Sequence, residues 1–152
     1  MLALTIRQPH AELIVCGKKQ IEIRTWWPRV QFPMLVAIHA GLQRDRNALG
    51  SLWNDDHFKP HSADWRLGGI IGVVRLVGLV QFGTWEMHGE RSARRLWKRL
   101  AAEHLNPLDS WARNKVGWRF DAPVRFPEII PCRGKQGLWM LPEEAERLVV
   151  TD

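Results

Sequence analysis

The chain has 152 residues, of which 45% are hydrophobic and 25% charged, with a formal net charge of +6 and a pI of about 10.0. These values are ordinary for a soluble globular protein and predict a single domain over residues 1–152 with a core of its own. The longest apolar run, Ile70 to Phe82, is interrupted by Arg75 and too short to span a membrane, so no membrane partner is expected. The basic balance favours partners that carry phosphate, although a solubilising surface charge explains it nearly as well.

The two cysteines, Cys16 and Cys132, lie far apart and form neither a C-x-x-C motif nor a zinc-binding spacing. We therefore expect reduced thiols, no bound metal and no cofactor. The first residues lack the basic leader of a signal peptide, and these features together predict a cytoplasmic protein.

The N-terminal part of the chain alternates strands with one short helix. Apolar residues at every second position predict a strand over residues 2–7. Pro9 suits the first turn of a helix, which Gly17 would end. Two further strands are predicted over residues 20–25 and 34–39.

The central part is predicted to contain a helix over residues 43–56, a loop over 57–67 and a helix over 90–105. Between them lies a long β-branched strand over residues 69–82, and its internal glycines, at 72 and 78, predict a bend or bulge. In the C-terminal part, three strands are predicted over residues 116–120, 124–130 and 137–141, followed by a last helix over residues 142–150. This order of short, bent strands and helices predicts an α+β fold, a small β-barrel of about five to seven strands with flanking helices.

Residues 17–24, with the sequence GKKQIEIR, combine a basic turn with a short alternating strand. Gly17 stands where the first helix would end, so that Lys19 follows the turn and Glu22 and Arg24 share one side of the strand. An arginine can hold a phosphate or a base edge, and a glutamate can accept a hydrogen bond from a base amino group. A surface ion-pair cluster is the simpler interpretation of the same three residues.

Four segments of the chain together resemble the ASCH domain family of the PUA-like superfamily, in its small bacterial and phage form. They are LTIRQP from residue 4, GKKQIEIRTW from residue 17, IHA from residue 38 and PCRGKQGLW from residue 131. The resemblance implies a small β-barrel with helices beside a cleft that faces RNA or DNA, lined by Lys19, Glu22 and Arg24.

Some small relatives are amidohydrolases that act on acylated cytidine with a lysine, a threonine and a glutamate. Lys19 matches their lysine, but Glu22 occupies the threonine position, and the long strand offers no glutamate because Arg75 is its only charged residue. This departure counts against the amidohydrolase interpretation. Other relatives have been proposed as ribonucleases.

Further candidate binding residues lie outside the motif. Arg7 and Gln8 end the first strand where the helix begins, Trp26 could stack on a base, and His39 ends a buried strand beside the expected cleft. The predicted helix over residues 90–105 gathers cations on one face and could follow a phosphate backbone, through Arg91, Arg95 and Lys98. A solvated helix face and core packing are the ordinary alternatives.

Three functions remain open from the sequence. The first is binding of RNA or another single-stranded nucleic acid. The second is hydrolysis of a modified nucleoside or of RNA, without a metal, with Lys19 and Glu22 as the catalytic acid–base pair. The third is an interaction module for an acidic protein, whose identity the sequence leaves unknown.

Overall fold

The computed structural model describes residues 1–46, 65–81, 87–88 and 115–151. Its strands form one sheet with the order β2-β6-β4-β3-β1-β7, and β5 pairs with β4. The elements are β1 (Leu2–Gln8), α1 (His10–Val15), β2 (Ile21–Arg24), β3 (Met34–Arg44), β4 (Gly69–Gln81), β5 (Met87–His88), β6 (Val116–Pro131), β7 (Leu138–Met140) and α4 (Glu143–Thr151). The predicted α+β class is confirmed, and the seven strands fall within the predicted number.

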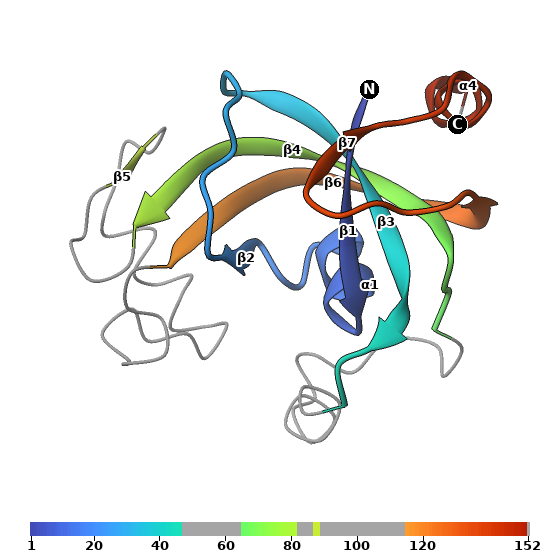
Figure 1. Ribbon diagram of the computed structural model, residues 1–152, viewed down its shortest axis with the longest axis horizontal. Coiled ribbons are helices and arrows are strands. Elements are labelled where there is room, and N and C mark those ends of the chain that lie inside the picture. Colours follow the sequence, from blue (N-terminus) through green and yellow to red (C-terminus); the bar gives the residue numbers. More distant parts are fainter. Residues whose placement is uncertain (47–64, 82–86, 89–114, 152) are drawn as a thin grey trace.

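The sheet is strongly curved, because the long strands β4 and β6 arch over β1 and α1 (Figure 1). β1 and β3 run parallel, and the other pairs are antiparallel. The ends of the sheet, β2 and β7, do not pair with each other in the described part of the chain. The predicted barrel is therefore an open, curved sheet over these residues.

Glycines bend the long strand, as the sequence predicted. The pairing of β4 with β6 shifts register at three places, two of which lie beside Gly72 and Gly78. A Cβ atom on Gly72 would lie 2.3 Å from the backbone oxygen of Val124 and 2.8 Å from Cγ1 of Val15. Gly72 is thus the point at which β6 and α1 both approach β4 closely.

Several predicted boundaries differ from the structure. β3 continues to Arg44, so the helix predicted from residue 43 does not begin there, and residues 47–56 of that helix lie outside the described chain. The helix predicted over residues 90–105 also lies outside it. The strands predicted over 116–120 and 124–130 are one strand, β6, which passes through Ala122 at a φ of 44°.

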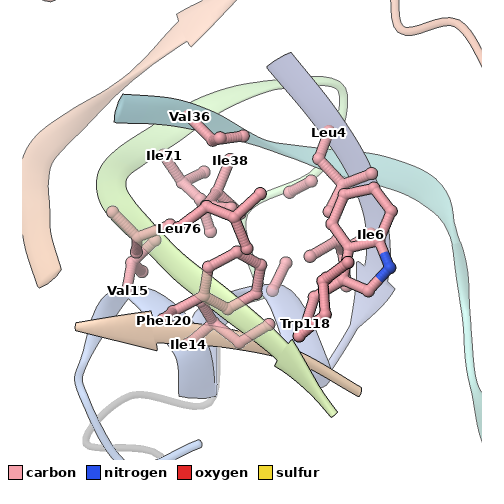
Figure 2. Packing of buried hydrophobic residues seen from close by; sticks show 14 of the residues in the cluster. Leu4, Ile6, Ile14, Val15, Val36, Ile38, Ile71, Leu76, Trp118 and Phe120 are labelled. Carbon is pink, nitrogen blue, oxygen red and sulfur yellow. The ribbon is translucent and has the colours of Figure 1, made fainter. Parts of the chain in front are cut away.

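Two clusters of buried side chains lie on opposite faces of the sheet. The larger cluster fills the concave side, where α1 packs Ile14 and Val15 against the strands and Trp118 and Phe120 of β6 close the interior (Figure 2). The smaller cluster packs the C-terminal part of the chain, including Trp139, against β1, β3 and β4. Within the described residues, neither helix is long and apolar enough to cross a membrane.

Candidate functional site

The turn after α1 places Lys19 beside the start of β2. Gly17 adopts a φ of +74°, and its N–H donates to Ile14 while the Lys18 and Lys19 N–H groups both donate to the carbonyl of Leu13. This is the Schellman type of helix end, in which a glycine takes the left-handed conformation and the last carbonyls are satisfied. The backbone of Lys19 is therefore fixed before its side chain makes any contact.

The predicted motif residues come together at this turn. Nζ of Lys19 lies 2.5 Å from Oε2 of Glu22, and Nε of Arg24 lies 3.4 Å from Oε1 of the same carboxylate. Nη2 of Arg24 also donates to the backbone carbonyl of Thr5 at 3.0 Å, which ties β2 to β1. These side chains are only 13%, 11% and 23% exposed for Lys19, Glu22 and Arg24, so the cluster is more buried than the sequence suggested.

The charge of Glu22 is stabilised by its neighbours. Burial by itself would raise the pKa of this carboxyl, but the positive charges of Lys19 and Arg24, together with the hydrogen bond from Lys19, lower its pKa overall. Glu22 is thus a carboxylate at neutral pH, held between two cations.

Two residues that the sequence analysis did not select complete the cluster. His10, the first residue of α1, has its Nδ1 atom 3.2 Å from Nζ of Lys19 and its Nε2 atom 3.2 Å from Oδ2 of Asp45. Asp45 follows β3, and its N–H donates to the carbonyl of Gln8 at 2.7 Å. The result is a continuous chain of hydrogen-bonding side chains, Asp45–His10–Lys19–Glu22, with Arg24 at its end.

Three exposed cations flank Thr5 or the residues that contact it: Arg7 on β1, and Arg133 and Lys135 on either side of Gly134, whose Cβ position would lie 3.0 Å from the Thr5 hydroxyl. The Thr5 hydroxyl donates to the backbone carbonyl of Lys135 at 2.8 Å and accepts from the indole N–H of Trp139 at 3.1 Å. Arg7 lies two residues beyond Thr5, on the same face of β1. The side chains of Arg7, Arg133 and Lys135 are exposed. We call Arg7, Arg24, Arg133 and Lys135 the Thr5 rim.

Trp26 packs against the main core and lines a pocket. Its ring packs edge-on against Trp118, with centroids 4.7 Å apart, and it is half-buried against the main core. Its other side borders an open pocket of about 340 Å³, lined by Leu2, Trp26, Pro28, Arg29, Val30, Gly137 and Leu138. Lys19, Glu22 and Arg24 do not line this pocket.

Gln8 has a structural role inside the molecule. It is completely buried, its Oε1 accepts from the N–H of Glu12, and its Nε2 donates to the carbonyl of Arg66. Glu12 in turn pairs with Arg66 at 3.2 Å and with Arg125 at 2.5 Å. Both hydrogen-bonding ends of Gln8 are therefore used inside the molecule, where they anchor the start of α1.

His39 lies on the sheet face of the smaller core cluster. It is 2% exposed, its Nε2 atom lies 3.0 Å from the carbonyl of Cys132, and its ring meets Trp139 edge-on. Burial lowers the pKa of His39, and the hydrogen bond to the Cys132 carbonyl opposes this shift only in part. A neutral histidine packed in this way is a structural residue, away from Lys19 and Glu22.

The remaining predicted contacts, Arg91, Arg95 and Lys98, lie outside the described residues. In the ranges that the structure does describe, no group of three or more histidine, cysteine or acidic side chains is arranged to hold a metal ion. His10 and Asp45 were missed because they are 35 positions apart in the sequence, and only the parallel pairing of β1 with β3 brings them together.

Comparison with known proteins identifies the relatives of this chain. The sequence model of the ASCH domain matches residues 4–122. No curated protein matches the chain in sequence. Among solved structures, an ASCH protein from Zymomonas mobilis superposes with a TM-score of 0.57 at 17% identity, covering 99% of this chain and 93% of the other.

Two mutant structures of the Zymomonas mobilis protein give similar results. Their TM-scores are 0.52 and 0.55, at 17% and 14% identity, with 99% of this chain covered in each case and 94% and 96% of the other chain. At these identities the likeness shows a shared fold, which agrees with the curved α+β sheet described above.

Proposed function

The chain belongs to the ASCH domain family, and on that basis we propose that it binds RNA in single-stranded form where Arg24 meets Thr5. The family has a PUA-like fold of a generally RNA-binding type. The observation that carries the proposal is the fixed position of Arg24, which is held by Glu22 and by the Thr5 carbonyl at the edge of an exposed cationic rim.

Arg24 suits the role of an anchor for the ligand. Its guanidinium is already oriented by one carboxylate and one backbone carbonyl, so little side-chain entropy is lost when a ligand binds. The side chain keeps 23% of its surface exposed, and that part is available to a phosphate or a base edge.

The Thr5 rim provides the sequence-independent part of the interaction. Lys19 and Arg24 are largely balanced by Glu22 and Asp45, so the ionic cluster contributes little net charge. The exposed members of the rim, Arg7, Arg133 and Lys135, form no ion pair with another residue of the described chain, and their charges would contact phosphates.

The pocket beside Trp26 offers a place for a base. Its lining includes the apolar side chains of Leu2, Val30 and Leu138, the aromatic Trp26 and the exposed cation Arg29. Stacking of one base on an aromatic ring contributes about 1–3 kcal/mol. We expect a strand that contacts Arg24 with its backbone to place one base in this pocket.

Fluorescence anisotropy with a labelled single-stranded RNA at several salt concentrations tests the proposal. If all four rim cations contact phosphates, the logarithm of the affinity should fall with the logarithm of the salt concentration with a slope of about −3. Arg24→Ala should weaken binding and reduce the slope by about 0.7, which is the share of one phosphate contact on a single strand. Arg147→Ala, at an exposed arginine of α4, is the matched control. An affinity that does not depend on salt, or an equal loss in both variants, would refute the proposal.

Hydrolysis is a second candidate, and one observation favours it. Lys19 contacts both Glu22 and His10 at hydrogen-bonding distance in a largely buried position, an arrangement that can transfer protons. Incubation with acylated nucleosides and short RNAs, followed by chromatography, tests this candidate. Turnover that is lost in Lys19→Ala supports it, and turnover that persists in that variant excludes the Lys19 mechanism.

A further inference from the structure

His10 connects two charged side chains through opposite nitrogens of its ring. Nδ1 faces the Lys19 ammonium at 3.2 Å, and Nε2 faces the Asp45 carboxylate at 3.2 Å. An ammonium group can only donate a hydrogen bond, and a carboxylate can only accept one. These contacts require a neutral ring that carries its proton on Nε2 and accepts at Nδ1.

Each partner of His10 is held by its own backbone contact. The N–H of Asp45 donates to the Gln8 carbonyl, two residues before His10, at 2.7 Å. The N–H of Lys19 donates to the Leu13 carbonyl at 3.0 Å, within the end of α1. The backbones of both residues that contact the imidazole, Asp45 and Lys19, are therefore fixed by hydrogen bonds.

The electrostatic surroundings agree with a neutral ring. Burial and the nearby charge of Lys19 lower the pKa of His10, while Glu22 and Asp45 oppose this shift. Lys19, Glu22 and Asp45 are the charged groups that face His10 in the described chain, from the turn after α1, from β2 and from the end of β3. The exposed Arg44 and Arg46 flank Asp45 in sequence.

We propose that His10 and Asp45 are positioning residues for Lys19, which hold its ammonium against Glu22 until His10 takes up a proton. This proposal deepens the RNA-binding function above and rests on it. A protonated His10 has two donors and no acceptor, so it must release Lys19. The cluster of His10, Lys19, Glu22, Arg24 and Asp45 then changes from a formal charge of zero to +1, and Glu22 alone still holds the Lys19 ammonium.

RNA affinity should therefore rise as the pH falls through the titration of His10. At about 0.1 M salt, one additional phosphate contact on a single strand increases the affinity by about fivefold. The ligand to use is labelled oligouridylate, because its bases do not titrate between about pH 5.5 and 7.5. We expect this increase in affinity between the higher and the lower pH in the wild type. In His10→Gln, whose side chain cannot be protonated, the ratio of the affinities at the two pH values should be near one.

His39→Gln is the matched control, because His39 also has a lowered pKa but lies beside Thr5 and contacts Cys132 and Trp139 rather than Lys19 or Asp45. It should keep the pH dependence of binding. The proposal would be overturned if His10→Gln kept the pH dependence of the wild type, or if only His39→Gln lost it.

A measurement without RNA separates the proposal from the binding function. Long-range ¹H–¹⁵N correlation spectra of the wild type at neutral pH should show His10 as the Nε2–H tautomer. Asp45→Ala should remove this preference without unfolding the protein. An Nδ1–H tautomer in the wild type would overturn the positioning role even if RNA binds. If RNA does not bind at any pH, the binding function fails, and the tautomer alone then decides whether His10 positions Lys19.

Discussion

The Lys19 ammonium lies 2.5 Å from the Glu22 carboxylate, and both side chains are more than four-fifths hidden from solvent. The pair joins the end of α1 to β2, which is itself held in the sheet by β6. It is the central contact of the candidate site, because every other member of the cluster reaches it directly or through His10. Its neighbours allow specific predictions about stability.

Glu22→Gln should destabilise the protein by about 3 kcal/mol, because removal of one partner leaves Lys19 and Arg24 with uncompensated, largely buried charge. Urea unfolding at neutral pH measures the loss. Glu143→Gln is the control, because Glu143 pairs with Arg147 on the exposed surface of α4 and should cost less than about 1 kcal/mol. Equal, small effects in both variants would contradict a buried ionic centre.

The stability of the wild type should fall when the pH drops below about 6.5. Both His10 and His39 have folded pKa values below 6.5, so the unfolded chain binds protons at these sites more readily than the folded one. Their contribution is complete above 6.5 and is lost as the pH falls toward the folded values. Urea unfolding at steps from about pH 7.5 to 5 should show this slope, which should be smaller in His39→Gln and smaller still in the double variant with His10→Gln. A slope that the double variant leaves unchanged would assign the acid sensitivity to other groups.

Gly134→Ala should destabilise the protein through His39. A Cβ atom at position 134 would lie 2.4 Å from Cε1 and 2.6 Å from Nδ1 of the His39 ring, and 3.0 Å from the Thr5 hydroxyl. The ring cannot move freely, because Trp139 and the Cys132 carbonyl hold it. Overpacking of this kind costs about 1–3 kcal/mol, which a thermal melt detects. Gln136→Ala, at an exposed position of the same segment, should leave the melting temperature unchanged, and a similar shift in both variants would contradict the account.

Local sequence signals predicted most of the described fold. Gly17 marked the end of α1, where its φ is positive, and Gly72 and Gly78 marked two places where the pairing of β4 with β6 shifts register. Gly72 also leaves room for Val15 and the backbone of Val124 to approach β4 closely. The prolines of β6 were misleading. Strands were predicted over residues 116–120 and 124–130, with Pro123 between them, but β6 is continuous. β2 pairs only with residues 116–119 of β6, so within the described chain no strand pairs with the later part of β6 on that side. A proline is tolerated on such an edge because its missing N–H is not needed there.

The candidate site was predicted only as far as its residues are close in sequence. Lys19, Glu22 and Arg24 lie within six positions, and their convergence was expected. Their burial was not, because it depends on the Thr5 carbonyl and on His10, which reach the motif from other elements. Asp45 depends on a parallel strand pairing across more than thirty residues, a relationship that local periodicity does not encode.

The most direct test of the account is a crystal structure of the protein with a short single-stranded RNA. We predict an ordered nucleotide whose phosphate or base edge lies within hydrogen-bonding distance of the Arg24 guanidinium, beside Thr5. An ordered nucleotide elsewhere on the protein, with the contacts of Arg24 to Glu22 and Thr5 unchanged and no ligand atom near them, would contradict the central claim.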